Sequence, residues 1–389
     1  MSHEEMGRRR NPWRNVLAVA VAAGVLALGV SACGSSDDST GTTSSDTTSS
    51  GGGAEGSGSG APNVVETSWG TFELAPEIAE KVENEESINY LFSFEASGTP
   101  SFGEQFTAGY EFGCAEGQKI YPLNCEIVAP VQPDVNQQIS QVQAKLAAGQ
   151  VDCFSIQPPT DTAVNALVNE VSAKGIPVFT VGEENDANAL MNFTQNHVKE
   201  GEVGAETVVK WMDENGKDFT VFGMSSGLPT LGWAQGRMEG FQKGIEAAIP
   251  DAKFINTQKN ATELPFEPGP ALDAAKSFIA ANPDVQVFMN TDINGEAINK
   301  AIADTGNKDK IYSIGWNPSM GQLDGIEAGY QIATVDQRWF DQAAYGGKAC
   351  ATFLKTGKIL PNTQKPDPIT LDKVPEARKA LESIEGGEG

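Results

Sequence analysis

The segment VDCFSIQPPTDTAVNALVNEVSAKGIPVFTV, residues 151–181, holds two apolar runs separated by an amphipathic stretch. The runs 151–156 and 177–181 are short and bounded by turn residues, which is typical of buried strands. Between them, apolar residues recur at helical spacing over 164–171, and Gly175 stands where such a helix would end. This order predicts two parallel strands joined by a crossover helix.

The same alternation extends in both directions along the chain. Further strands are predicted at 88–94, 125–129, 219–224, 285–289, 311–315 and 331–335. Helices are predicted at 135–146, 200–212, 232–248, 272–281, 296–304 and 342–354. Because the rhythm starts again after Asn196, the sequence predicts an α/β protein with two doubly wound parallel-sheet lobes.

Length and charge narrow the class of protein. A chain of 389 residues is long enough for two domains and a processed leader. Its formal net charge of −25 creates an acidic field that repels phosphate. We therefore expect no nucleic acid among its partners.

The N-terminal segment predicts export. Four arginines (Arg8, Arg9, Arg10 and Arg14) precede the apolar run 16–30, which is shorter than the roughly 20 residues of a membrane-spanning helix. The run ends in Ser31-Ala32-Cys33, which resembles a bacterial lipobox. That resemblance implies a signal peptide over 1–32 and a diacylglycerol on Cys33.

The segment that follows is predicted to be a tether. Residues 35–60 are almost entirely Ser, Thr, Gly and Asp, a composition that stays a flexible coil. We assign 33–63 to the lipid-anchor cysteine and a linker. The body is therefore expected at the outer face of the cell membrane, outside the cytoplasm.

Four cysteines remain after the lipobox. They form no CxxC pair, and only one histidine, His197, lies beyond the signal peptide, so we expect neither a metal site nor a cofactor. Cys114 and Cys125 are close in sequence and are predicted to form a disulfide, which an exported protein permits. Cys153 and Cys350 are either a second bridge or two buried thiols.

Polar and aromatic residues follow the predicted strands. Open α/β sheets bind ligands at the carboxyl ends of their strands, so these segments mark the candidate site. They are 95–102, 157–160, 182–184, 291–292, 316–317 and 336–337.

A series of short motifs carries a family resemblance. In chain order they are FSIQP at 154–158, GIPV at 175–178, TQN at 194–196, RMEGF at 237–241, NPD at 282–284, NTD at 290–292, IGWN at 314–317 and ATVDQ at 333–337. Their order and spacing resemble the type I periplasmic binding proteins of the ribose- and galactose-binding branch, over about 88–374.

The resemblance implies a particular organisation of the body. Two lobes are joined by a three-segment hinge, with crossings near Thr194, Gln337 and Pro368. The N-terminal lobe is expected to comprise 84–193 and 338–366. The C-terminal lobe is expected to comprise 194–337 and 367–389.

The resemblance also implies a ligand pocket. Phe102 would stack on a sugar face, and Arg237 would donate to a ligand oxygen as a charged donor. The residues expected to hydrogen-bond hydroxyls are Gln157, Asn196, Thr291 or Asp292, Asn317 and Gln337. Asn196 could instead only satisfy backbone groups at its crossing. Trp233 and Trp339 fit a pocket, a core or a hinge equally well.

Three departures from the family pattern bear on the ligand. Gly182-Glu183-Glu184 stands where the family often has Asp-Arg, and Asn317 stands where it has Asp. The first loop is longer, with residues 98–101 before Phe102. These changes argue against ribose itself and leave a polyol, another monosaccharide or a different small polar molecule open.

The function implied is that of a monomeric solute-binding lipoprotein that delivers a sugar to an ABC transporter permease. A sensor subunit that presents its ligand to a membrane receptor is the alternative. An enzyme is disfavoured because His197 is the only imidazole base beyond the signal peptide and no nucleophile motif occurs, although Glu183 and Glu184 are an acidic pair. A repressor of the same fold would need a basic DNA-binding domain in place of the export signal.

Overall fold

The first sheet has five parallel strands. The computed structural model describes residues 63–385, so the predicted signal peptide and Cys33 lie outside the described residues. The strand order is β4 (Leu123–Val128), β3 (Ile88–Ser93), β5 (Cys153–Ile156), β6 (Val178–Val181) and β7 (Met191–Phe193). The predicted strand–helix–strand unit at 151–181 is confirmed, since β5 and β6 pair in parallel.

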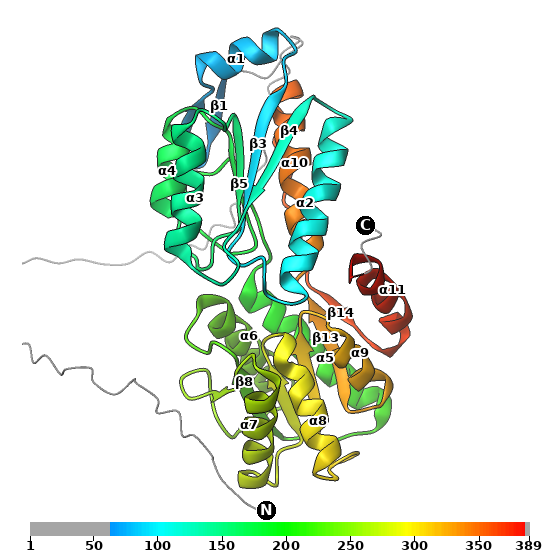
Figure 1. Ribbon diagram of the computed structural model, residues 1–389. Coiled ribbons are helices and arrows are strands. Elements are labelled where there is room, and N and C mark those ends of the chain that lie inside the picture. Colours follow the sequence, from blue (N-terminus) through cyan, green and yellow to red (C-terminus); the bar gives the residue numbers. More distant parts are fainter. Residues whose placement is uncertain (1–62, 386–389) are drawn as a thin grey trace, which may run out of the picture. The chain divides into compact units, whose positions relative to one another are not determined.

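Helices cover both faces of this sheet (Figure 1). On one side lie α2 (Phe102–Gln118) and α10 (Trp339–Thr356), and on the other lie α3 (Val135–Ala147) and α4 (Asn165–Ala173). Glycines let α2 approach α10 closely: a Cβ added at Gly113 would lie 2.2 Å from the carbonyl oxygen of Ala344. Residues 339–356 therefore pack in the first lobe, where they share its core.

An N-terminal segment that the sequence did not assign also belongs to the first lobe. The antiparallel hairpin β1 (Val64–Thr67) and β2 (Gly70–Glu73) is followed by α1 (Pro76–Glu83). Phe72 and Ile78 are buried in the same core as the first sheet. The first lobe thus begins earlier than the expected residue 84.

The second sheet has seven strands within the described residues. Its order is β10 (Thr262–Glu263), β8 (Val221–Ser226), β11 (Val287–Asn290), β12 (Tyr312–Trp316), β13 (Gln331–Asp336) and β14 (Asp367–Ile369), with β9 (Lys253–Phe254) also on β8. All pairs are parallel except β13 with β14. The expectation of a wholly parallel sheet is corrected at this edge, where the returning chain adds a strand in the opposite direction.

Helices also cover both faces of the second sheet. α5 (His197–Asn215) and α6 (Gly232–Ala248) pack on one face, and α7 (Pro268–Ala281) and α8 (Glu296–Asp304) pack on the other. Successive side chains of β11 point to opposite faces of the sheet. Val287 and Met289 join the α5–α6 core, while Phe288 joins the α7–α8 core.

The chain after β12 completes the second lobe. α9 (Met320–Glu327) packs against α11 (Val374–Glu385), which follows the short helix η2 (Leu371–Lys373). A second short helix, η1 (Ile293–Gly295), follows β11.

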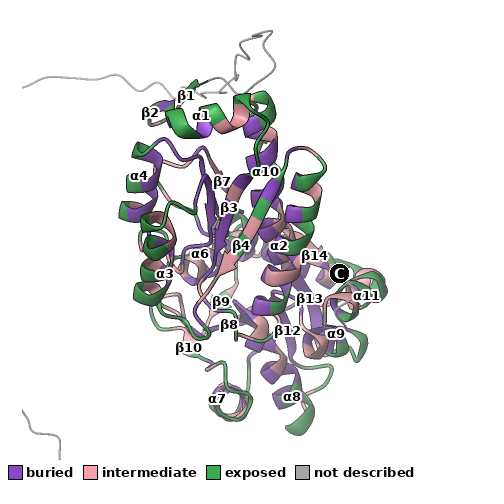
Figure 2. Ribbon diagram, turned by 45° about the horizontal axis from the view of Figure 1, so that its top comes forward, coloured by how far each residue is buried: buried purple, intermediate pink, exposed green. Residues whose placement is uncertain are grey.

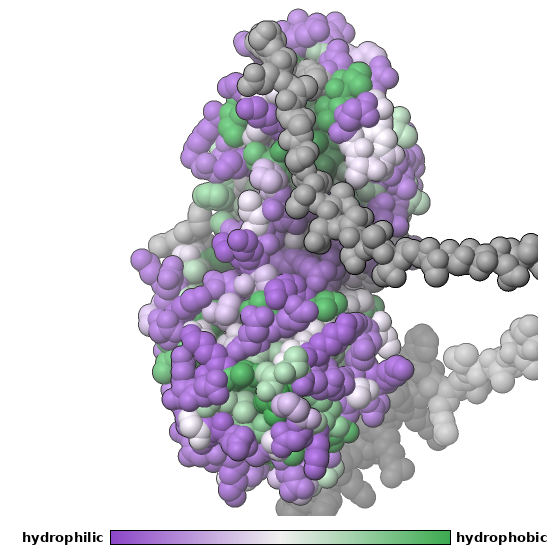
Figure 3. All heavy atoms as spheres, turned by 180° about the vertical axis from the view of Figure 1, so that it is seen from behind, coloured by the Kyte–Doolittle hydropathy of each residue, from purple (hydrophilic) through white to green (hydrophobic). Residues whose placement is uncertain are grey.

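Burial follows these layers. In Figure 2 the strands are mainly buried, while the outer helices show exposed residues on the sides that face away from the sheets. Hydrophilic side chains dominate the face seen in Figure 3, which agrees with the acidic composition. Over residues 63–385, no helix combines the length and apolarity needed to cross a membrane.

Three chain segments that link the lobes meet at Gln195. Its side-chain Nε2 lies 3.1 Å from the carbonyl oxygen of Gln337, 3.1 Å from that of Lys365 and 3.1 Å from Oε1 of Gln364. The third crossing thus precedes the expected Pro368, which is already paired within β14.

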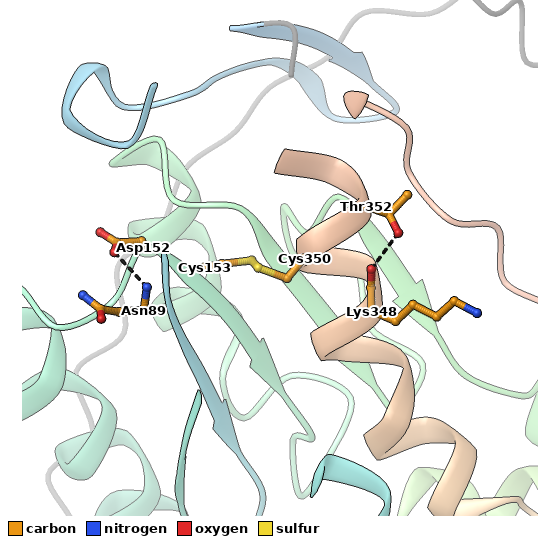
Figure 4. The surroundings of a disulfide bond; sticks show 6 residues. All are labelled: Asn89, Asp152, Cys153, Lys348, Cys350 and Thr352. Atoms are coloured by element: carbon orange, nitrogen blue, oxygen red, sulfur yellow. Dashed lines mark hydrogen bonds between the residues drawn. A yellow bond between two sulfur atoms is a disulfide. The ribbon is translucent and has the colours of Figure 1, made fainter. Parts of the chain in front are cut away.

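Two disulfides strengthen the first lobe. Cys114–Cys125 joins α2 to β4, the pair that the sequence predicted. Cys153–Cys350 joins β5 to α10, which decides the question that the sequence left open (Figure 4). Beside it, the backbone N–H of Asn89 donates to the carboxylate of Asp152, which also pairs with Lys81.

Candidate functional site

A cavity of about 460 Å³ lies at the carboxyl ends of the strands of both sheets. Residues of the first lobe, the second lobe and the hinge all line it. Its polar and charged lining includes Glu95, Thr99, Gln132, Gln157, Glu183, Arg237, Asp292, Asn317, Gln337 and Gln342. The volume suits a small molecule, and the position is the one expected for a ligand site in open α/β sheets.

Aromatic side chains form part of the cavity wall. Phe102, the first residue of α2, is nearly buried and packs edge-on against Trp339, with ring centroids 5.1 Å apart. Trp233 and Phe266 line the cavity from the second lobe. Such faces can cover the apolar sides of a sugar ring while polar groups fix its orientation.

Gln157 holds the loop that follows β3. Its Oε1 accepts a hydrogen bond from the backbone N–H of Glu95 at 3.1 Å, and its Nε2 donates to the carbonyl of Pro158 at 2.6 Å. This places the Glu95 side chain in the cavity wall. Burial, together with the nearby carboxylates of Glu183 and Asp292, raises the pKa of Glu95 to about 8.

Asp292 and Asn317 form a polar pair on the second lobe. Asn317 Nδ2 donates to Asp292 Oδ1 at 2.9 Å, and the backbone N–H of Ile293 donates to the same oxygen at 2.7 Å. Asn317 has a φ of 58°, a left-handed conformation that asparagine tolerates better than most residues. Burial raises the pKa of Asp292.

Arg237 is held by protein acceptors. Its Nε donates to Glu200, its Nη1 to the carbonyl of Thr291 at 2.8 Å and its Nη2 to Gln337 Oε1 at 2.7 Å. The guanidinium also lies over the ring of Trp233, 5.2 Å from its centroid. Three of its five N–H groups are thus in use, which leaves two that a ligand could engage.

A buried charged cluster, which we call the His197 network, begins at the cavity wall with Glu183 and Arg237 and continues behind it with His197 and Glu200. His197 Nε2 lies 3.2 Å from Glu183, and its Nδ1 lies 3.4 Å from Glu200. Although burial alone would lower the pKa of His197, the attraction of Glu200 and Glu183 raises it to about 10. Burial likewise opposes ionisation of Glu200, but Arg237 and His197 outweigh it and lower that pKa to about 2.

The structure brings most of the predicted site residues together. Phe102, Gln157, Arg237, Asp292, Asn317 and Gln337 all line the cavity.

Two predicted residues lie elsewhere. Asn196 is exposed and caps α5, with its Oδ1 accepting from the N–H of Lys199 at 2.8 Å. Thr291 turns its hydroxyl to Ser226 and offers only its backbone carbonyl to Arg237. Asn196 therefore satisfies backbone groups at its crossing, the simpler of the two roles that its sequence position allowed.

Sequence reasoning did not single out several residues of the site. Glu95 lies two residues after the end of β3, within the segment 95–102 that the sequence marked for the candidate site, but it was not named as a ligand contact. Trp233 and Trp339 both line the cavity, a role that the sequence could not separate from core or hinge. Glu200 is fully buried within α5 and gave no signal, because nothing local identifies Arg237 as its partner.

Comparison with known proteins identifies the family. The family described as periplasmic binding protein domain matches residues 96–359, well over half of the chain. The protein belongs to this family, and the resemblance to type I periplasmic binding proteins is confirmed.

Individual relatives are distant in sequence. The D-allose-binding periplasmic protein of Escherichia coli (strain K12) is 24% identical over 221 residues, which span 54% of this chain and 65% of that relative. A glucose-galactose binding protein from Geobacillus stearothermophilus has a TM-score of 0.62 at 20% identity, covering 74% of this chain and 99% of that one. A Caulobacter myo-inositol binding protein bound to myo-inositol gives 0.62 at 20% identity, covering 75% and 96%. These structures share the fold.

Proposed function

We propose that this protein is an extracytoplasmic solute-binding protein of an ABC importer, which binds a small polyhydroxylated molecule between its lobes. The observation that carries the proposal is the cavity of about 460 Å³, lined from both lobes by aromatic faces and polar side chains. Each sheet contributes the carboxyl ends of its strands. Binding involves no chemical reaction of the ligand, and the protein is proposed to act as a carrier rather than an enzyme.

The ligand class follows from the lining and from the relatives. Aromatic faces such as Phe102 suit the C–H faces of a sugar or cyclic polyol, and Asn317 and Gln337 suit its hydroxyls. The relatives named for D-allose, for glucose and galactose, and for myo-inositol all bear names in this chemical class. We therefore place the ligand among monosaccharides and polyols.

Closure of the lobes on the ligand is part of the proposal. The cavity wall is divided between lobes that are linked through the three segments gathered at Gln195. Hinge closure around a ligand is known in periplasmic binding proteins. Small-angle scattering should show a smaller radius of gyration with a saturating ligand, and an unchanged radius would count against closure.

Anchoring is proposed from the sequence alone. A lipid on Cys33 and the linker to residue 63 would hold the body near a permease in the membrane. Mass spectrometry of the native membrane fraction should find residue 33 as an acylated N-terminus. An unmodified protein that begins elsewhere would contradict this part of the proposal.

A ligand screen tests the binding function. Thermal unfolding with D-allose, D-galactose, D-glucose and myo-inositol should show a higher melting temperature for at least one, because a ligand of the folded state stabilises it by mass action. Calorimetric titration of Trp233→Ala should then show affinity weakened by about 2- to 12-fold, the contribution of one aromatic contact. Phe112→Ala is a matched control, since Phe112 is exposed outside the cavity. Failure of every monosaccharide and polyol to bind would refute the ligand class.

A further inference from the structure

Three carboxylates present an oxygen to the cavity. Glu95 and Glu183 come from the first lobe, and Asp292 comes from the second. Among residues 63–385, Oε1 of Glu183 and Oδ2 of Asp292 accept no hydrogen bond, whereas the Gln157 side chain stabilises the charge of the Glu95 carboxylate. Asp292 and Glu183 are only 9% and 7% exposed, so these two oxygens are largely shielded from bulk solvent. Buried carboxylate oxygens without donors are costly, and a ligand that supplies donors relieves that cost.

The nearby cations do not balance these charges. Arg237 is paired with Glu200, a fully buried carboxylate behind the cavity wall. His197 lies between Glu183 and Glu200 and serves both. Four carboxylates in and behind the wall therefore share two cations. Neither Glu95 nor Asp292 has an ion pair within the part of the chain that the structure describes.

The two carboxylates without ion pairs come from opposite lobes. Glu95 follows β3 at the carboxyl edge of the first sheet, and Asp292 follows β11 at the corresponding edge of the second. The carboxylates of Glu183 and Asp292 add to the effect of burial in raising the pKa of Glu95, so negative charge on the second lobe opposes ionisation of Glu95 on the first. A cation placed between them would offset this repulsion and lower the pKa of Glu95 from about 8, so that Glu95 ionises on binding and both lobes are attracted to the cation.

We propose that the natural ligand carries a protonated amine on its polyhydroxylated frame, as in an amino sugar or an amino polyol, with the ammonium held between Glu95 and Asp292. This inference rests on the proposed function and specifies its ligand. An ammonium offers three donors, enough for one oxygen each of Glu95, Glu183 and Asp292. The aromatic faces and the size of the cavity indicate an organic cation rather than a bare metal ion, which needs a close shell of oxygen ligands.

Matched pairs of ligands test the charge directly. Calorimetric titrations at pH 7 would compare D-glucosamine with D-glucose, D-galactosamine with D-galactose, and D-glucamine with D-glucitol. At least one amine should bind about tenfold or more tightly than its neutral partner. Its N-acetyl form, which keeps the nitrogen but loses the charge, should bind no better than the neutral compound.

Substitution locates the charge in the cavity. Glu95→Gln keeps the size of the side chain but cannot ionise when an ammonium binds beside it, so the preference for the amine should fall to about threefold or less. Glu83→Gln is the matched control, because Glu83 is exposed on the same lobe and lies outside the cavity. It should keep the full preference.

The possible outcomes distinguish failure of the charge proposal from failure of the proposed sugar-binding function. If neutral compounds bind as tightly as their amines, the charge proposal is overturned and the sugar-binding function stands. If the preference survives Glu95→Gln, the ammonium is not at Glu95, and the placement is overturned. If neither member of any pair binds, the proposed ligand class fails as well. A rise in melting temperature with calcium chloride alone would overturn the proposal in favour of a metal site.

Discussion

The two lobes are built on similar sheets but are stabilised differently. The first lobe contains both disulfides and one continuous core, in which rings such as Phe92, Phe94 and Phe106 stack on one another. The second lobe has no cysteine in its described part, and its core is divided into smaller clusters. Covalent links and aromatic packing hold one half of the site, whereas polar contacts hold much of the other.

The polar contacts of the second lobe continue beneath the cavity. Ser313 donates to Asn299 at 2.6 Å, Asn299 to Gln331 at 2.6 Å, and Gln331 to Gln322 at 2.8 Å. Gln322 in turn donates to the carbonyl of Asn317, a cavity residue, at 2.8 Å. Buried hydrogen-bond networks favour a single arrangement, so this chain positions the backbone of Asn317, whose Oδ1 accepts no hydrogen bond within the described residues.

The largest effect is expected from the disulfide that spans the first lobe. Cys153 and Cys350 are 197 residues apart, and closing so long a loop contributes about 5 kcal/mol in the chain-entropy model. The double variant Cys153→Ala, Cys350→Ala should therefore unfold at lower denaturant. Hydrogen exchange should accelerate in β5 and α10 and stay unchanged in β8 and β11. Equal acceleration in both lobes would show that they unfold as one unit.

The second lobe should be most sensitive at Arg237. Arg237→Ala leaves Glu200 charged and buried without its partner, and breaking a buried pair in this way costs about 3–5 kcal/mol. Denaturant unfolding measures the loss. Arg378→Ala is a control, because Arg378 pairs with Asp324 and Glu327 at the surface, where such pairs contribute about 0–1 kcal/mol. If Arg237→Ala lowers the free energy of unfolding no more than the control does, the Arg237–Glu200 ion pair does not stabilise this lobe.

The same variant also tests ligand binding. Two N–H groups of Arg237 remain for a ligand, and a hydrogen bond from a charged donor contributes about 1.5–3 kcal/mol. Folded Arg237→Ala should therefore bind about 10- to 150-fold more weakly in a calorimetric titration, and lysine should restore only part of the loss. Affinity within twofold of the wild type would assign Arg237 a purely structural role.

A smaller effect is expected from the second disulfide of the first lobe. Cys114 and Cys125 are 11 residues apart, and so short a loop contributes about 2–3 kcal/mol in the same model. Cys114→Ala with Cys125→Ala should lower stability by about half as much as loss of the long-range bridge. Parallel urea titrations of the two double variants give the ratio, and a reversed order would contradict the loop-length argument.

How much of the fold and of the site could be predicted from the sequence depends on how far apart in the chain the interacting residues are. The sheets and most helices follow from local periodicity, so β5, α4 and β6 appear in the sequence almost as they fold. Cavity residues such as Asn317 could be assigned to the site because the ends of strands can be recognised locally, and the carboxyl ends of parallel strands lie at the same edge of the sheet. The hairpin of β1 and β2 is short and half exposed. It is stabilised by packing against the core of the first lobe, a contact that local sequence does not indicate. Glu200 and His197 likewise depend on partners from other segments, which no single-sequence pattern reveals.

The smallest effect expected is a difference in how stability changes with pH, and it arises in the His197 network. The folded pKa of His197 is about 10, above its ordinary value of 6.5, because Glu200 and Glu183 face it and outweigh burial and the nearby Arg237. A raised folded pKa means that the protonated histidine stabilises the fold fully below pH 6.5, and this contribution is lost as the pH rises toward 10.

Between pH 6.5 and 8 the loss is at most about 2 kcal/mol, since one proton contributes about 1.4 kcal/mol per pH unit. His197→Gln cannot titrate, so its unfolding free energy should change less over this interval than that of the wild type. Glu95 has a folded pKa of about 8 and titrates over the same range in both proteins, so its effect cancels in the difference. Denaturant titrations at pH 6.5 and pH 8 give the slope of unfolding free energy against pH for the wild type and for the variant. Identical slopes would show that His197 is already neutral in the folded protein, and Arg237 would then be the only cation of the network that stabilises Glu200.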